Sequence, residues 1–293
     1  MSGAARGPKS FTREELEELY GNHPISEKNI LARLERAGVR DPNISPLDLA
    51  RDPLTEITDQ NHVGGYDFVS QLGHAAGVSA GDAVLDLCCG LGGSARLLAF
   101  LFGARVHGID LSAPRIAQGQ RLTSLVRLES RVTLECADIR RASVPEHRFD
   151  VLWGQSAWVH LEDRDALLAR WVRALRPGGR LALEDACLAH PPRSRSDRRR
   201  LVELEEIWKA HLVPQEDWIS PVERLFTVEK LEDLAGKFER YFARLAKIAG
   251  GPGRDYFTAA EIRGCELAVT LAQAGVLGYF RLVARIRPYE SRG

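Results

Sequence analysis

Short apolar runs alternate with amphipathic stretches through the middle of the chain, from residue 82 to residue 187. The apolar runs have the length of strands buried on both faces, and the stretches between them have the spacing of helices. The runs are AVLDLCC (83–89), RVHGIDL (105–111), VTLECAD (132–138), FDVLWGQS (149–156) and RLALEDA (180–186). This alternation predicts an α/β fold with a parallel, doubly wound sheet.

Helical patterns flank this region on both sides. Thr12 with Glu15, and Ser26 ahead of apolar positions at helical spacing, predict two helix starts in a helical extension over residues 1–60. Residues 61–190 are expected to form the sheet core, 191–275 a helical cap at its carboxyl edge, and 276–293 a terminal strand, because YFRLVARIRP alternates. The cap and the extension together would form a lid.

Composition and charge narrow the function. The chain has 293 residues, with 40 basic and 40 acidic side chains, so a protein that depends on neutralising many phosphates of a nucleic acid is not expected. No apolar run approaches the roughly 20 residues of a membrane span, and no apolar leader opens the chain, so we expect a cytoplasmic protein. The five cysteines lack paired metal-ligand spacing, and neither disulfides nor a metal site is expected.

The segment VLDLCCGLGGSARLLA, residues 84–99, carries the strongest chemical signal. A strand containing Asp86 passes through a turn with Gly90 and Gly92 into a helix that begins near Ser94. Glycines let the backbone approach a ligand closely, and the free N–H groups of a helix start favour a negative group. The segment predicts a site for a nucleotide-like ligand.

Two cofactors fit this loop, and the carboxylates separate them. The spacing satisfies G-x-G-x-x-A, and Asp110 after the second strand can accept both hydroxyls of a ribose, which serves NAD as well as S-adenosylmethionine (SAM). Asp86 would crowd a pyrophosphate but suits an ammonium group, and Asp138 with Ile139 suits an adenine. These residues favour SAM, and an NAD-dependent oxidoreductase is the alternative from another class.

From about Gln60 to Ala186 the chain resembles the class I SAM-dependent methyltransferases. The resemblance rests on VLDLCCGLGG, HGIDLS, CADI, FDVLWGQSAWVH and LRPGGRLALEDA, in the order of that family. DQNHVGG and WGQSAWVHLEDRDALL resemble small-molecule members of the sarcosine/dimethylglycine N-methyltransferase kind, although Ser156 and Ala157 stand where those enzymes more often have an acidic residue. The resemblance implies a mostly parallel, seven-stranded, Rossmann-like sheet with an antiparallel last strand.

The resemblance also implies residue roles. Eight residues are expected to bind the cofactor, which leaves as S-adenosyl-L-homocysteine: Asp86, Gly90, Gly92, Asp110, Leu111, Asp138, Ile139 and Gln155. Methyl transfer from a sulfonium is an in-line displacement, so the protein must mainly align the acceptor and exclude water, and a base is needed only where the acceptor loses a proton. The candidate bases are His160, His62 and Glu184 with Asp185.

Three aromatic residues are candidates for substrate contact. Trp158 and Tyr66 could face the developing positive charge, and Tyr20 could close over the methionine end of the cofactor. Each candidate also has a structural explanation, such as core packing for Trp158. We expect methyl transfer to a small-molecule acceptor, with amine nitrogen favoured over oxygen, carbon or sulfur. No nucleic-acid, membrane or metal partner is expected, a homodimer is left open, and a catalytically silent partner subunit is a third hypothesis.

Overall fold

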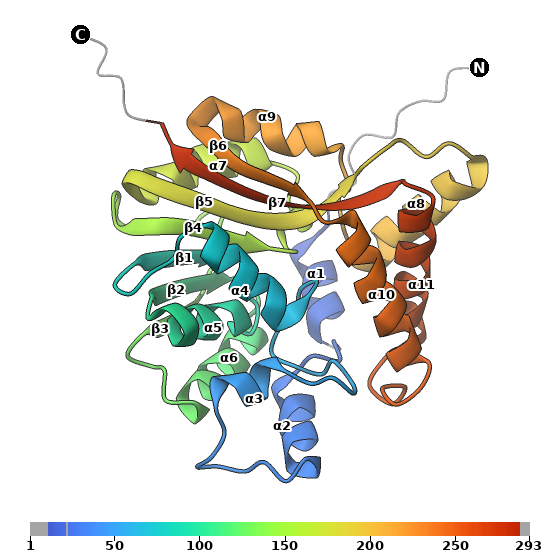
Figure 1. Ribbon diagram of the computed structural model, residues 1–293, viewed down its shortest axis with the longest axis horizontal. Coiled ribbons are helices and arrows are strands. Elements are labelled where there is room, and N and C mark those ends of the chain that lie inside the picture. The colour runs from blue at the N-terminus through green and yellow to red at the C-terminus, as the bar shows by residue number, and fades with distance from the viewer. Residues whose placement is uncertain (1–10, 22, 288–293) are drawn as a thin grey trace.

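One seven-stranded sheet organises the molecule (Figure 1). The computed structural model describes residues 11–21 and 23–287. The strand order is β3–β2–β1–β4–β5–β7–β6, and β7 runs antiparallel to both of its neighbours. The strands are β1 (Ala83–Leu87), β2 (Arg105–Asp110), β3 (Val132–Cys136), β4 (Phe149–Gln155), β5 (Leu175–Leu188), β6 (Phe226–Asp233) and β7 (Leu277–Ile286). The predicted doubly wound fold with an antiparallel last strand is confirmed.

Helices cover both faces of the sheet and one of its ends. They are α1 (Arg13–Gly21), α2 (Glu27–Arg36), α3 (Pro46–Ala50), α4 (Gly65–Ala75), α5 (Gly93–Phe102), α6 (Ala113–Leu125), α7 (Arg164–Trp171), α8 (Arg195–Trp208), α9 (Gln215–Leu225), α10 (Ala235–Ala249) and α11 (Ala259–Gln273). A short 3-10 helix, η1 (Trp158–His160), follows β4 and a second, η2 (Val172–Ala174), follows α7. Among the described helices we find none with the length and apolar character that a membrane span requires.

The N-terminal helices begin where the sequence predicts. The amide of Glu15 donates to Thr12 Oγ1 at 3.2 Å and the amide of Thr12 donates to Glu15 Oε2 at 2.9 Å, which is the predicted capping box. Ser26 Oγ accepts from the amide of Asn29 at the start of α2. These caps set the residues at which α1 and α2 begin.

The cap region contains a strand that the sequence analysis did not predict. Residues 191–275 were expected to be helical, but β6 at Phe226–Asp233 pairs with β7 at the edge of the sheet. Most side chains of β6 are exposed or half-buried, and four of its eight residues are charged. Edge strands are often protected by charge, and this removes the apolar alternation that would reveal a strand.

The helices on either side of β6 pack together at one end of the sheet. Figure 1 shows α8, α10 and α11 gathered at the right of the molecule, and α11 contacts both α8 and α10. The chain reverses its strand order between β1 and β4. In open α/β sheets, ligands bind outside the carboxyl ends of the strands at such a point. The cap helices and the switch point therefore border the same part of the sheet edge.

Candidate active site

Two adjoining pockets lie at the carboxyl edge of the sheet. The first is lined by residues at the ends of β1, β2 and β4 and after β3, together with α1. The second is lined by the helices α8, α10 and α11 together with residues 19–20, 23–25, 56 and 61–63 and the ends of β4 and β5. Residues common to both linings are Tyr20, Asn61, His62, Ser156 and His160. The two pockets therefore adjoin at these five residues.

Asp86 provides a buried carboxyl group in the first pocket. It is 3% exposed, and its Oδ2 atom has no hydrogen-bond partner within the described residues. Burial, and to a smaller extent the charge of Asp110, raises the pKa of Asp86 to about 8. An unpaired buried acceptor of this kind is costly for the protein unless a ligand supplies a donor or a positive charge.

The carboxylate of Asp110 is held at the end of β2 by backbone amides. The amide of Gly90 donates to Oδ2 at 2.8 Å, and the amide of Ser112 donates to Oδ1 at 2.9 Å. Gly90 has a φ of 55°, a left-handed conformation that glycine adopts without strain. The glycine turn thus fixes the direction of a carboxylate, while each of its oxygens keeps a lone pair for a ligand hydroxyl. Leu111 lines the pocket beside it.

The far end of the first pocket is formed by the residues that follow β3. Asp138 accepts from Arg140 Nε at 3.0 Å, and both side chains line the pocket. Ile139 is 5% exposed and lies beside them. This end therefore offers an apolar side chain next to a carboxylate that a cation already orients.

Gln155 at the end of β4 has its amide locked in one orientation. Its Oε1 accepts from Ser94 Oγ at 3.0 Å and from Trp153 Nε1 at 3.1 Å, and its Nε2 donates to Glu184 at 2.8 Å. Gln155 is 7% exposed and lines the first pocket. These hydrogen bonds fix the position of the Gln155 side chain in the lining of that pocket.

The glycines of the loop serve different purposes. Gly92, expected at the cofactor, is absent from the residues that line the first pocket. It has a φ of 72° at the start of α5, and a Cβ there would lie 2.8 Å from Leu134 Cδ1. A Cβ on Gly93 would lie 2.1 Å from the carbonyl oxygen of Asp59. Gly92 thus shapes the turn into α5, and its expected role at the cofactor stays a prediction. Gly93 allows the close approach of residues 59–60.

Tyr20 and His160 meet in the wall that the two pockets share. The Tyr20 hydroxyl and His160 Nε2 lie 2.6 Å apart, and His160 Nδ1 lies 2.8 Å from the carbonyl oxygen of Lys209. A carbonyl oxygen only accepts, so Nδ1 carries the proton and Nε2 accepts from the Tyr20 hydroxyl. Burial lowers the pKa of His160 and thereby favours this neutral form.

His62 lies in the shared wall without presenting a free nitrogen. Nδ1 is 3.1 Å from the carbonyl oxygen of Val63, and Nε2 is 3.0 Å from Oε1 of Gln60. Burial lowers the pKa of His62 to about 4. Both nitrogens face oxygen acceptors of the protein, so this geometry does not support His62 as a base.

Glu184 lies outside the two pockets and is not positioned as a base. Its side chain is fully buried and forms an ion pair with Arg281 Nε on β7 at 2.5 Å. The neighbouring Asp185 does line the second pocket. Its Oδ2 accepts from the amides of Trp158 at 2.9 Å and Val159 at 3.3 Å. The structure therefore corrects the expectation for Glu184, whose carboxylate joins two strands.

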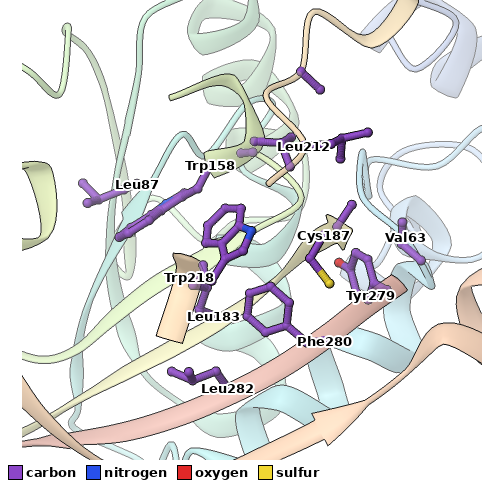
Figure 2. Close-up of a cluster of buried hydrophobic side chains, with 14 of the residues drawn as sticks. Val63, Leu87, Trp158, Leu183, Cys187, Leu212, Trp218, Tyr279, Phe280 and Leu282 are labelled. Carbon is purple, nitrogen blue, oxygen red and sulfur yellow. The ribbon is translucent and has the colours of Figure 1, made fainter. Parts of the chain in front are cut away.

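Two of the three aromatic candidates lie away from the pockets. Trp158 is 3% exposed within the apolar cluster drawn in Figure 2, together with Leu87, Leu183 and Trp218. Tyr66 on α4 is half-buried against a different apolar cluster, and the guanidinium of Arg51 lies 3.7 Å from the centre of its ring. The structural explanation of Trp158 is thus the correct one, and only Tyr20 lines a pocket.

Two residues of the site were not found by sequence reasoning. Asn61 lines both pockets from within DQNHVGG, next to the His62 that the motif analysis selected. Arg115 on α6 is 3% exposed and lines the first pocket, and its Nε and Nη2 atoms have no partner in the part of the chain that the structure describes. Its Nη1 donates to the carbonyl of Ile25 at 3.2 Å. Its position five residues after Asp110 was the available signal.

Comparison with known proteins agrees with this geometry. Residues 84–179 match the methyltransferase domain family. Methyltransferase GfsG of Streptomyces halstedii is 36% identical over 134 residues, which cover 46% of this chain and 46% of that protein. This chain therefore spans less than half the length of that curated relative. The match places a methyltransferase domain on the strands β1 to β4 and the start of β5.

Solved structures share the fold at low sequence identity. The geranyl diphosphate C-methyltransferase of Streptomyces coelicolor A3(2), solved with Mg2+, geranyl diphosphate and S-adenosyl-L-homocysteine, has a TM-score of 0.66 at 17% identity. That match covers 89% of this chain and 84% of the other. A sarcosine dimethylglycine methyltransferase structure from Galdieria sulphuraria has a TM-score of 0.64 at 18% identity, with coverages of 75% and 83%. Both confirm the Rossmann-like methyltransferase fold.

Proposed function

We propose that this chain, which carries a methyltransferase domain over residues 84–179, transfers a methyl group from SAM to a small molecule. The observation that carries the proposal is the pair of pockets with a shared wall at the carboxyl edge of the sheet. The first pocket is assigned to the cofactor and the second to the acceptor. From here on they are called the cofactor pocket and the acceptor pocket.

The amino-acid end of SAM has partners in the cofactor pocket. The unpaired Oδ2 atom of Asp86 suits an ammonium group, and the unpaired donors of Arg115 suit a carboxylate. Both groups are 3% exposed, and a ligand carrying both charges would satisfy them. NAD fits this end poorly, because its pyrophosphate would be buried against the carboxyl group of Asp86.

The nucleoside end of SAM fits the rest of the cofactor pocket. Asp110 and Leu111 would hold the ribose, since the oriented carboxylate can accept from two hydroxyls. Asp138 and Ile139 would hold the adenine, by a hydrogen bond from its amino group and by apolar contact. Gln155 would close the pocket near the reactive end.

The chain's own residues would align the acceptor and move a proton. The bound cofactor supplies a methyl group on a sulfonium, already activated for in-line displacement. Tyr20 and His160 lie where the acceptor must approach. For an acceptor that loses a proton, the Tyr20 oxygen accepts that hydrogen bond while its own proton moves to His160 Nε2. The helix α1 that carries Tyr20 would also exclude water.

Amine nitrogen is our favoured accepting atom, with oxygen as the alternative. Both fit the Tyr20–His160 pair, which can take a proton from either. A thiol that loses its proton would use the same pair, whereas the geometry gives a carbon acceptor no specific partner. Identification of the methylated product would distinguish these accepting atoms.

Two measurements test the proposal. Binding of S-adenosyl-L-homocysteine (SAH) and of NAD to the purified protein separates a methyltransferase from an oxidoreductase, and we expect SAH to bind and NAD to compete poorly. Transfer of label from methyl-labelled SAM to a fractionated cell extract should then place the label in the small-molecule pool. Tight NAD binding without SAH binding would contradict the proposed activity, and label only in RNA or protein would contradict the substrate class.

A further inference from the structure

The lining of the acceptor pocket restricts the chemistry of the acceptor, provided that the proposed function holds. None of the described residues that line this pocket is a lysine or an arginine. Its three histidines are His23, His62 and His160. Burial lowers the pKa of His23 to about 3 and that of His62 to about 4, and it also lowers the pKa of His160. The pocket therefore presents no positive charge at neutral pH.

The carboxyl groups of the pocket are already committed to the protein. Glu56 forms an ion pair with Arg244, and Glu261 forms the capping box of α11 with Thr258. Asp185 accepts from backbone amides at η1. These three side chains lend the pocket acidic character, yet none is left as a free counter-ion. A phosphate would therefore meet acidic groups and find no cation to pair with.

The rest of the wall is apolar and aromatic. The rings of Trp208 and Phe242 lie 5.3 Å apart, and those of Phe238 and Phe242 lie 4.7 Å apart. Phe238 also stacks on Tyr279 at 5.6 Å. Such packed rings favour an apolar body and make the burial of an unpaired charge costly. Polar groups are concentrated at the shared wall, where the accepting atom must lie.

We propose that the acceptor is an uncharged, predominantly apolar molecule without a phosphate group, whose accepting hydroxyl or unprotonated amine points toward Tyr20. Its apolar body would lie among Trp208, Phe238 and Phe242. This pocket then differs in ligand charge from the structurally similar enzyme that was solved with geranyl diphosphate and Mg2+. The same fold would then bind an uncharged acceptor in place of an anionic one.

A matched pair of probes tests this proposal. Geraniol and geranyl diphosphate share one apolar chain and differ only in the charged group. With the protein saturated with SAH, the neutral fluorophore N-phenyl-1-naphthylamine should bind, and geraniol should displace it at a concentration at least about tenfold lower than geranyl diphosphate does. Equal or stronger displacement by the diphosphate, or absence of fluorophore binding, would overturn the proposal.

A charge-introducing variant checks that the probes occupy the acceptor pocket. Leu245 lines this pocket and is half-buried, so Leu245→Lys adds a cation there without burying it fully. We expect geranyl diphosphate to displace the fluorophore from this variant at a concentration at least about tenfold lower than from the unmodified protein. Leu231→Lys, at an exposed site on β6, is the matched control and should change nothing.

SAH binding is measured separately on all three proteins, so the two proposals fail independently. Loss of SAH binding by the unmodified protein would contradict the methyltransferase function. Normal SAH binding with an unchanged preference in Leu245→Lys would contradict only the assignment of the acceptor.

Discussion

At the scale of single residues, Asp86 is a buried carboxyl group whose Oδ2 atom lacks a hydrogen-bond partner among the described residues. Its carboxyl is buried in the cofactor pocket with one oxygen unpaired, and burial raises its pKa to about 8. At pH 7 it is therefore mainly protonated in the free protein. An ammonium group beside it would favour the ionised form, so ligand binding and proton release are coupled.

We predict that Asp86→Asn abolishes this coupling. The unmodified protein should release close to one proton from Asp86 on binding SAH at pH 7, and the variant should lose that release together with at least about tenfold in affinity. Calorimetry in two buffers of different ionisation enthalpy measures both quantities. Comparison with the variant removes any contribution from the ligand's own amino group. Equal proton release in the two proteins would show that Asp86 does not meet the ammonium.

Three of the residues expected at the cofactor occupy positions that depend on local pattern. Asp86, Asp110 and Asp138 lie at or just after the carboxyl ends of buried strands, and all three line the cofactor pocket. Such positions follow from the strand pattern alone, because the carboxyl ends of parallel strands meet at one edge. The sequence does not show that a side chain at Gly92 would meet Leu134, because this depends on packing between α5 and β3.

The residues that were misassigned depend on distant partners. Glu184 is neutralised by Arg281, which lies 97 positions later in the chain. The burial of Trp158 depends on Trp218 and the rest of the cluster in Figure 2. Arg115, which sequence reasoning did not find, contacts the Tyr20 ring on α1 and the carbonyl oxygen of Ile25 between α1 and α2. Sequence spacing carries no information on these contacts, so the pocket walls could be predicted only in part.

At the scale of elements, α1 is attached to the site through Tyr20. The Tyr20 hydroxyl bonds to His160, and the guanidinium of Arg115 lies 5.2 Å from the centre of the Tyr20 ring. Tyr20→Phe removes the hydrogen bond and keeps the ring. We predict about fivefold faster release of SAH, in line with the loss of roughly 1 kcal/mol from one hydrogen bond.

Stopped-flow fluorescence measures this release. Tyr241→Phe is the matched control, because Tyr241 lines the acceptor pocket and its hydroxyl has no hydrogen-bond partner among the residues described. The same acceleration in both variants would mean that the Tyr20–His160 bond does not hold α1 over the cofactor.

The contact between α5 and the segment before α4 depends on Gly93. A methyl group at this position would lie 2.1 Å from the carbonyl oxygen of Asp59. The side chain of Asp59 forms an ion pair with the buried Arg96. We predict that Gly93→Ala lowers the free energy of unfolding by about 1–3 kcal/mol and weakens SAH binding. Denaturant titration and calorimetry measure the two effects.

Gly236→Ala is the control for Gly93→Ala. A Cβ at Gly236 in α10 would meet only the flexible end of Arg240 at 3.4 Å, so its free energy of unfolding should change by less than about 1 kcal/mol. A Gly93→Ala protein as stable as this control would mean that the segment at Asp59 moves away without cost.

The buried ion pair between β5 and β7 provides a test of Glu184. Arg281→Met leaves the fully buried Glu184 without its cation and should lower the free energy of unfolding by about 3–5 kcal/mol. Adding Glu184→Met to this variant should recover most of the loss, because an apolar pair replaces the ion pair. Denaturant titration of the single and double variants measures this. A double variant no more stable than Arg281→Met would contradict the structural role of the pair.

At the scale of the whole molecule, the sequence predicts the central strands of the sheet better than the edge strand β6. Buried β1 and β4 have continuous apolar runs that predict strands, whereas β6 carries charges along an exposed edge. Its identity as a strand is set by pairing with β7. This difference explains why the domain core was predictable and the arrangement of the cap was not.

The buried titratable groups also give the whole molecule a predicted pH dependence. Burial raises the pKa of Asp86 to about 8 and that of Asp185 to about 7. In the unfolded chain these groups ionise near pH 4. Between pH 4 and 8 the folded state therefore binds more protons through them, so their contribution to stability falls as the pH rises.

The buried histidines have the opposite effect on the free energy of unfolding, and only at lower pH. The pKa values of His23 and His62 are lowered to about 3 and about 4 by burial, so their contribution to stability rises with pH up to about 6.5, where the unfolded histidines also become neutral. Above pH 6.5 the carboxyl groups act without this opposition.

We predict that the free energy of unfolding of the ligand-free protein falls by on the order of 2 kcal/mol between pH 6.5 and 8.5. Asp86→Asn should flatten this slope, because an amide has no proton to lose, and at pH 8.5 the variant should be more stable than the unmodified protein. Saturating SAH should stabilise the unmodified protein more at pH 8.5 than at pH 6.5, since it pairs with the ionised carboxylate. Denaturant titrations at the two pH values measure these differences. Stability that rises to pH 8.5, or an equal slope in Asp86→Asn, would show that the buried carboxyl does not titrate in this range.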